Sequence, residues 1–425
     1  MAVKKTLQRA KRVARKVGLF SAPAPHLSKD DVAAARKYIA EYWPKLVREN
    51  TSDTDSLLGV PKPYFVPASE EGHEFDFNEL YYWDSYFMVQ GMLDEEHKEF
   101  VLGILENLES LFLRFKVIPN ASRTYLMGRS QPPLLTSFIF DIYEAYGMDD
   151  AWLQTHIAIA KQEYETVWMG TAKPHWRLVH EGLSRYYDIN MLHDLAEAES
   201  GWDMTPRFNR RALDYLPADL NSLLFRYEAD FAKAARIEGN AEELAKWEEA
   251  AEQRATKMQK LMWDKSRNLF YDYNYKKGKR GSVSSLAGFY PLWAGLVDDD
   301  QAASMLKALK RFEHKGGLAT TDAVQLNQYV PGSMPTQWAY PNGWAPLELL
   351  VIRGLERYGY HDDARRIALK WLKANLEWFN AHGVFLEKYN VVAPEKPPVR
   401  GVYPSQTGFG WTNAVFERLC KEYVD

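Results

Sequence analysis

The stretch Gln337-Trp-Ala-Tyr-Pro-Asn-Gly-Trp-Ala-Pro346 runs directly into residues 345–358, where apolar residues recur three and four positions apart. That spacing is typical of an amphipathic helix, and the Gly, Pro and Trp residues stand before it rather than within it. Other acid and aromatic clusters of the chain also lie between helical segments. We therefore predict a helical scaffold whose unusual residues sit in loops, where active-site residues commonly lie.

The same periodicity predicts helices along most of the chain, and a Ser28-Lys-Asp-Asp31 start signal opens the first of them. The segments are 28–48, 84–115, 136–168, 217–237, 241–264, 299–312, 345–358, 362–380 and 412–423. The best strand signal is Leu269–Asn274, before a turn at 277–280. About a dozen helices in antiparallel pairs fit this length. We predict an all-α, double-layered helical barrel with short β-hairpin insertions.

Composition narrows the classes of function. The net charge of −4 gives no general attraction to nucleic acid, and a single cysteine excludes an intrachain disulfide. No linker divides the chain, so we expect one barrel domain over 26–425 after a basic arm over 1–25. No apolar run is long enough for a secretory signal or a membrane span. We expect a cytoplasmic monomer without nucleic-acid partners, although the arm could tether the protein to an anionic surface.

Common chemical motifs are missing from the chain. It has no Walker A sequence, no Gly-x-Gly-x-x-Gly, no His-Glu-x-x-His and no EF-hand loop. The nearest approach to a metal cluster is His175, His180 and His193 with two neighbouring acids, and its spacing matches no known ligand pattern. We therefore predict no metal site.

What remains is a series of clusters that combine acids or amides with aromatic residues. A carboxylate beside Trp in a glycine-bearing loop is a plausible general acid, because partial burial keeps its proton on near neutral pH. A second, ionised carboxylate could activate water, and glycoside hydrolysis needs such a pair. Taken singly, each Trp-Asp pair is more often structural. The clusters are Tyr81–Phe87, Glu199–Asp203, 337–346, Glu387–Tyr389 and Gly408–Asn413.

In this order the motifs resemble the trehalases, glycoside hydrolase family 37, over residues 75–416. The resemblance implies an (α/α)6 barrel, an inverting mechanism, a sugar substrate and no cofactor. It also implies that Asp203 is the general acid and Glu387 the general base, with their carboxyl groups about 6.5–9.5 Å apart. The motifs are Tyr81–Phe87, Pro119–Arg123, Arg129–Pro133, Glu199–Asp203, Pro341–Pro346, Glu387–Tyr389 and Gly408–Asn413.

The resemblance also assigns residues to substrate binding. The pocket that holds the cleaved glucose is expected to be lined by Trp83, Asp84, Asn120, Arg129 and Gln131. Trp344 is expected to stack against the sugar. The remaining expected contacts come from these motifs and from the cluster at residues 337–346. The binding residues implied are Trp83, Asp84, Asn120, Arg129, Gln131, Trp202, Gln337, Trp338, Trp344, Tyr389 and Trp411.

Several family contacts are altered in this chain. The Arg expected before the first signature is replaced by Asp76, and the usual Gln-Trp-Asp reads Gln337-Trp-Ala339. A stretch with an Arg and a Glu is missing between Asp188 and Glu199, and Val402 stands where a Glu is usual. Trehalose is the first expected substrate. Another small α-glucoside, such as glucosylglycerate or kojibiose, is the main alternative, and a catalytically silent sugar-binding protein is the alternative of another class.

Overall fold

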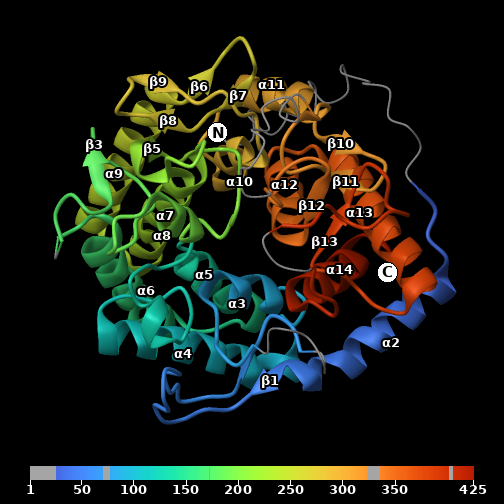
Figure 1. Cartoon of the computed structure of the whole chain (residues 1–425). Coiled ribbons are helices and arrows are strands. Elements are labelled where there is room, and N and C mark those ends of the chain that lie inside the picture. Colours follow the sequence, from blue (N-terminus) through green and yellow to red (C-terminus); the bar gives the residue numbers. More distant parts are fainter. Residues whose placement is uncertain (1–24, 70–76, 172, 324–335, 402–404) are drawn as a thin grey trace.

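The computed structural model describes residues 25–69, 77–171, 173–323, 336–401 and 405–425. Within them the helices form two concentric rings around one axis (Figure 1). The inner ring consists of α3 (Tyr82–Val89), α5 (Leu135–Tyr146), α8 (Ala218–Glu238), α10 (Tyr290–Ala294), α12 (Ala345–Arg357) and α14 (Gly410–Tyr423). The outer ring consists of α2 (Lys29–Leu46), α4 (Lys98–Phe115), α6 (Asp150–Glu163), α9 (Ala241–Leu261), α11 (Asp299–Leu309) and α13 (His361–His382). The predicted (α/α)6 barrel is confirmed.

The two rings begin their helices in different ways. Four of the six outer helices, α2, α6, α9 and α11, start with local caps: the side chains of Ser28, Asp149, Asn240 and Asp298 each accept a hydrogen bond from a backbone N–H of the first turn. No such side-chain cap bond is made by the N-cap residues of α3, α5, α8, α12 and α14. Their first N–H groups therefore need partners from other parts of the chain.

Those partners come from neighbouring elements that are distant in the sequence. The Leu135 N–H at the start of α5 donates to the hydroxyls of Tyr82 and Tyr227, at 3.0 and 2.9 Å. The Ala218 N–H at the start of α8 donates to Asp272 at 2.9 Å. Side chains distant in sequence thus fix where the inner helices begin.

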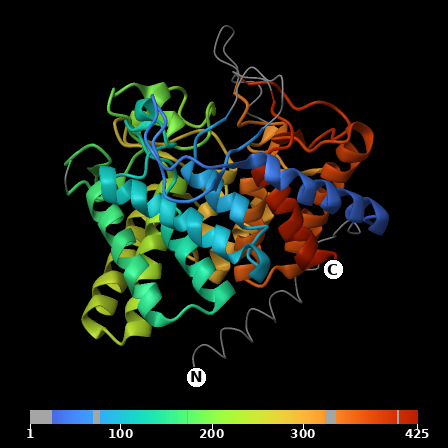
Figure 2. The same ribbon diagram turned by 90° about the horizontal axis from the view of Figure 1, so that it is seen from below.

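Short antiparallel strands and the longer loops gather mainly at one end of the barrel (Figure 2). There β12 (Asn342–Trp344) pairs with β13 (Lys388–Asn390), with Trp344 opposite Lys388. The other elements are β1 (Val47–Arg48), β2 (Tyr64–Phe65), β3 (Leu178–His180), β4 (Leu183–Ser184), β5 (Tyr215–Leu216), β6 (Trp263–Asp264), β7 (Leu269–Phe270), β8 (Tyr273–Asn274), β9 (Lys279–Arg280), β10 (Glu313–His314), β11 (Gly317–Leu318), α7 (His193–Ala198), a π-helix at Tyr164–Trp168, and 3-10 turns at Glu95–His97, Thr124–Leu126, Ala212–Asp214 and Leu286–Phe289.

The structure divides several predicted segments more finely. Residues 84–115 and 136–168 each hold two α-helices, and the predicted strand 269–274 is divided between β7 and β8. The short helices α7 and α10 were not predicted, because they are too short to establish a period.

Of the basic arm predicted for residues 1–25, only Pro25 is described. No helix in the described part of the chain has the length and apolar character needed to cross a membrane.

A fully buried ion triad joins a loop to the inner ring. The Arg207 guanidinium donates to both oxygens of Asp219, each at 2.7 Å, and to those of Asp272 at 2.8 and 3.0 Å. Asp219 lies in the first turn of α8, and Asp272 also accepts from its first N–H. The loop from residue 203 to 208 is thereby held against the start of α8.

Replacement of Arg207 tests the importance of this triad. Arg207→Met should lower the free energy of unfolding by about 3–5 kcal/mol, because two carboxylates would remain buried without their cation. Urea unfolding measures the loss. The matched control is Arg210→Met, which breaks an exposed pair with Asp194 and should cause a much smaller loss. Equal losses in the two variants would contradict the proposed role of the triad.

Candidate active site

A pocket of about 210 Å³ lies where the inner helices begin. Trp83 and Asp84 come from the first turn of α3 and Trp411 from the first turn of α14, while the other lining residues come from the loops around these helix starts. The described lining residues are Pro67, Phe77, Tyr81, Trp83, Asp84, Gln131, Gly201, Asp203, Trp338, Glu387, Gln406, Phe409 and Trp411. Three carboxylates therefore share one largely aromatic hollow.

Asp203 lies in the loop between α7 and α8. Burial, together with the nearby charge of Glu387, raises its pKa to about 7, while Arg129 acts in the opposite direction. Its backbone carbonyl accepts a hydrogen bond from the Gln337 amide at 2.7 Å, so the segment before β12 holds this loop in place. With a pKa near 7, a substantial fraction of this carboxyl group is protonated at neutral pH and can donate its proton.

Glu387 directly precedes β13. Its carboxylate pairs with the Lys388 ammonium at 2.6 Å, and both side chains are almost fully buried. The Glu387 backbone is fixed on both sides, because its N–H donates to the Gln406 carbonyl at 2.9 Å and its own carbonyl accepts from the Trp411 indole at 3.0 Å. The Lys388 ammonium is thus the direct charge partner of the Glu387 carboxylate in this buried position.

The third carboxylate, Asp84, is held by Gln131. The Gln131 side chain accepts a hydrogen bond from the Trp83 N–H at 2.9 Å and also bonds the Asp84 carboxyl group. Burial raises the pKa of Asp84 to about 8, and the charges of Asp203 and Glu387 add to this effect. Burial therefore favours the protonated form of Asp84 near neutral pH, and the two neighbouring carboxylates act in the same direction.

Tryptophan rings form the wall of the pocket. The rings of Trp83, Trp338 and Trp411 lie 5.8–6.2 Å apart, between centroids. Behind them, Trp344 stacks on Trp338 at 3.7 Å with an interplanar angle of 3°, and Trp202 stacks on Trp338 at 5.5 Å. The described wall offers flat apolar faces against which a sugar ring can pack.

The structure thus brings together most, but not all, of the residues predicted from the sequence. Those that line the described pocket are Trp83, Asp84, Gln131, Asp203, Trp338, Glu387 and Trp411. The others stand behind or beside this lining, and they are Asn120, Arg129, Trp202, Gln337, Trp344 and Tyr389.

The residues outside the lining make specific internal contacts. Arg129 pairs with Asp188 at 3.1 Å, and Asn120 donates to the Ser130 carbonyl at 3.2 Å. Tyr389 is fully buried, and its hydroxyl accepts from the Leu386 N–H at 3.0 Å. These side chains support the loops that carry the lining residues.

Six lining residues were not identified from the sequence. Tyr81, Gly201 and Phe409 stand inside motifs already singled out, so their position beside an acid or a Trp was the available signal. No sequence signal marks Pro67, Phe77 and Gln406, because they belong to none of the motifs and only the folded chain brings them to the pocket. Of the altered family positions, Asp76 and Val402 lie outside the described residues, and Ala339 is buried.

Glu199 ties the loops around the pocket together. Its fully buried carboxylate pairs with Arg177 and accepts from the backbone N–H groups of Ser130 and Tyr187, each at 2.7 Å. These bonds join three separate loops at one point.

Within the described residues, no group of His, Cys, Asp or Glu side chains could hold a metal ion.

Comparison with known proteins agrees with this geometry. The model of the family described as trehalase matches residues 4–197 and 171–424. The chain belongs to the trehalase family. It is 33% identical to the cytosolic neutral trehalase of Kluyveromyces lactis over 428 residues, which are 83% of this chain and 55% of that relative. It is 31% identical to the periplasmic trehalase of Escherichia coli over 426 residues, covering 89% of this chain and 72% of the relative.

A solved structure supports the same assignment. The neutral trehalase of Saccharomyces cerevisiae superposes with a TM-score of 0.74 at 31% identity, covering 85% of this trehalase-family chain and 74% of the yeast chain. The chain spans a little over half the length of the fungal relatives that it matches, 55–58%.

Gly201 provides a test of the wall geometry. Its φ is +73°, and a Cβ there would lie 2.6 Å from the Trp83 ring. Gly239 also has a positive φ, +79°, but a Cβ there would meet open space. Gly239→Ala should therefore cost only the backbone strain, about 1–2 kcal/mol. Gly201→Ala should cost clearly more, because the ring must also move, and calorimetric Tm values that rank the variants the other way would refute this.

Proposed function

We propose that this protein is an inverting glycoside hydrolase that converts trehalose and water into two molecules of glucose. The observation that carries the proposal is that Asp203, with a pKa raised to about 7, and Glu387, paired with Lys388, line one aromatic pocket. One group can donate a proton while the other accepts one. Membership of the trehalase family supports the choice of substrate.

The proposed reaction is a single displacement. Asp203 protonates the glycosidic oxygen, and the bond from that oxygen to one anomeric carbon breaks. Glu387 takes a proton from a water molecule as the water oxygen forms a new bond to the same carbon from the opposite face. The charge develops on an oxocarbenium-like sugar between the two groups. Asp203 is then ionised and Glu387 protonated, and solvent restores both.

The other pocket residues are proposed to hold the sugar. Asp84 and Gln131 offer hydrogen bonds to hydroxyls, and the faces of Trp83, Trp338 and Trp411 exclude water from the ring. Arg129, Asn120, Trp202, Gln337, Trp344 and Tyr389 are proposed as positioning residues, because the contacts that they make fix the surrounding loops.

The proposed function also requires that the catalytic unit be defined. We propose that residues 26–425 form one catalytic domain, preceded by a basic arm, and that the protein acts as a monomer in the cytoplasm. The contact between α3 and α14, which joins the first and last inner helices, supports a single unit. The matched relatives include proteins named cytosolic and periplasmic.

The substrate and the stereochemistry can be tested together. The purified protein should hydrolyse trehalose, and proton NMR should show equal initial amounts of α-glucose and β-glucose, because only one anomeric carbon is inverted. Kojibiose, maltose, sucrose and glucosylglycerate serve as comparisons. Faster turnover of one of these would replace trehalose but keep the mechanism. Ligand binding without product from any of them would favour a silent sugar-binding protein.

The acid role of Asp203 gives a prediction for pH dependence. The protonated form is required, so kcat/KM should fall as pH rises through about 7. Asp203→Asn should lower kcat by at least about 100-fold with the fold retained. The matched control is Asp298→Asn at the start of α11, where Asn caps a helix equally well. A flat profile between pH 6 and 8, or near-normal turnover by Asp203→Asn, would exclude the assignment.

A further inference from the structure

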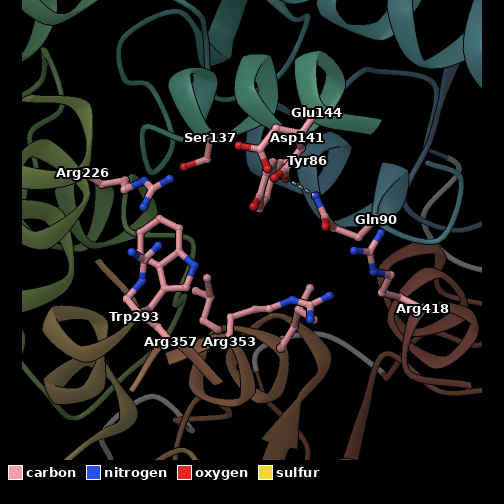
Figure 3. A pocket seen from close by; sticks show the side chains of 12 residues that line it. Tyr86, Gln90, Ser137, Asp141, Glu144, Arg226, Trp293, Arg353, Arg357 and Arg418 are labelled. Atoms are coloured by element: carbon pink, nitrogen blue, oxygen red, sulfur yellow. Dashed lines mark hydrogen bonds between the residues drawn. The ribbon is translucent and has the colours of Figure 1, made fainter. Parts of the chain in front are cut away.

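A second cavity, of about 380 Å³, lies inside the inner ring (Figure 3). Every inner helix contributes to it: α3 and α5, α8 and α10, and α12 and α14. The described lining residues are Tyr86, Gln90, Ser137, Asp141, Glu144, Arg226, Trp293, Leu349, Leu350, Arg353, Arg357 and Arg418. We call it the arginine cavity.

The arginine cavity is separate from the sugar pocket. The two share no described lining residue. On α14 the sugar pocket is lined by Trp411 and the arginine cavity by Arg418, seven residues further along the helix. At 1.5 Å of rise per residue, this separation is roughly 10 Å along α14. The arginine cavity lies inside the inner ring, and on α14 it is further from the amino end than the sugar pocket is.

The lining of the arginine cavity has more cations than anions. Four guanidinium groups face two carboxylates, Asp141 and Glu144. Glu144 is already engaged by Lys233 at 2.5 Å. Burial raises the pKa of Asp141, which accepts a hydrogen bond from Gln90 at 2.8 Å. The lining thus offers two carboxylates to four arginines, and one of these carboxylates is already engaged by a lysine.

Carboxylates just outside the lining engage some of these arginines. Arg226 pairs with Asp230 at 3.0 Å. Arg353 pairs with Glu356 at 2.8 Å and with Glu422 at 2.6 Å, and Glu422 also pairs with Arg418. A guanidinium has five N–H donors, and these bonds use only some of them. Donors therefore remain for a molecule within the cavity.

Arg357 has no such partner. It makes no hydrogen bond or ion pair with any residue in the described part of the chain. Although the residue is accessible to solvent, the surrounding protein and the like charge of Arg226 lower its pKa. Two guanidinium groups that repel each other beside one cavity are stabilised by an anion placed between them.

Compensation of helix dipoles accounts for only part of this pattern. The carboxyl ends of helices are negative and attract cations within the last turn. Arg353 and Arg357 lie near the end of α12, where that effect operates. Arg226 lies twelve residues before Glu238, the end of α8, and beside Trp293. Its place on the cavity wall needs another explanation.

We propose that the arginine cavity binds a small phosphate-bearing anion, either inorganic phosphate or the phosphate monoester of a sugar. Guanidinium groups bind tetrahedral oxyanions through paired N–H donors. Tyr86 and Ser137 add hydroxyl groups to the lining, and Trp293 adds a flat apolar face. The volume exceeds that of a bare phosphate ion and leaves room for a sugar-sized group.

The test is isothermal titration calorimetry of the full chain at physiological ionic strength. The probes are inorganic phosphate, glucose 6-phosphate and glucose. The test variant is Arg357→Gln, chosen because no described partner is lost with it. The matched control is Arg280→Gln on β9, an exposed arginine that donates a long hydrogen bond of 3.4 Å to the Lys260 carbonyl. Unchanged far-ultraviolet circular dichroism and Tm confirm that both variants are folded.

We expect saturable binding of phosphate that weakens at least ten-fold in Arg357→Gln and changes less than two-fold in Arg280→Gln. Phosphate and glucose 6-phosphate should displace each other, whereas binding of glucose should be insensitive to Arg357. Tighter binding of glucose 6-phosphate identifies the ligand as a monoester, and equal binding identifies the phosphate ion. Absence of saturable phosphate binding, or equal affinity in parent and Arg357→Gln, overturns the proposal.

Discussion

Parallel orientation of the inner helices is the constraint on which the rest of the structure depends. Each inner helix from α3 to α12 is followed by an outer helix that returns the chain, so equivalent ends of the inner helices converge on the axis. Their amino ends carry partial positive charge and their carboxyl ends partial negative charge. The three pocket carboxylates gather at the amino ends. Arg353 and Arg357 lie near the carboxyl end of α12, whereas Arg226 lies midway along α8. The orientation of the helices therefore accounts for the place of the sugar pocket and for part of the arginine cavity.

The loops at the amino ends are fixed by buried polar groups rather than by regular secondary structure. Glu199 joins three of them, and Arg207 anchors the loop that carries Asp203. Because these bonds are shielded from water, each loop is held in one arrangement at a substantial desolvation cost. Rigid loops of this kind are what a proton donor and a proton acceptor need in order to face one substrate.

Much of the fold could be predicted from the sequence because long amphipathic segments encode their own periodicity. Residues 217–237 and 362–380 were found within two residues of α8 and α13. The five-residue α10 gives no period, and its place in the inner ring is decided by packing against α8 and α12. Local pattern therefore predicted the scaffold but missed an element that tertiary contacts stabilise.

The candidate site was also predictable only in part, because a local sequence pattern identifies residues but not their tertiary contacts. Short motifs identified the carboxylates, but a motif does not state which way each side chain points. Trp344 packs behind Trp338 instead of facing the pocket, and Arg129 binds Asp188. Pro67 and Gln406 reach the pocket from positions that no neighbouring residue marks.

The capping of inner helices from a distance limits how this barrel can be modified. The first N–H of α8 depends on Asp272, a residue more than fifty positions further along the chain. A chimaera that exchanges α8 between relatives would separate the helix from its acceptor unless the β7–β8 connection moved with it. The barrel is therefore not a set of interchangeable parts, and recombination breakpoints should be chosen to keep each inner helix with the distant side chains that begin it.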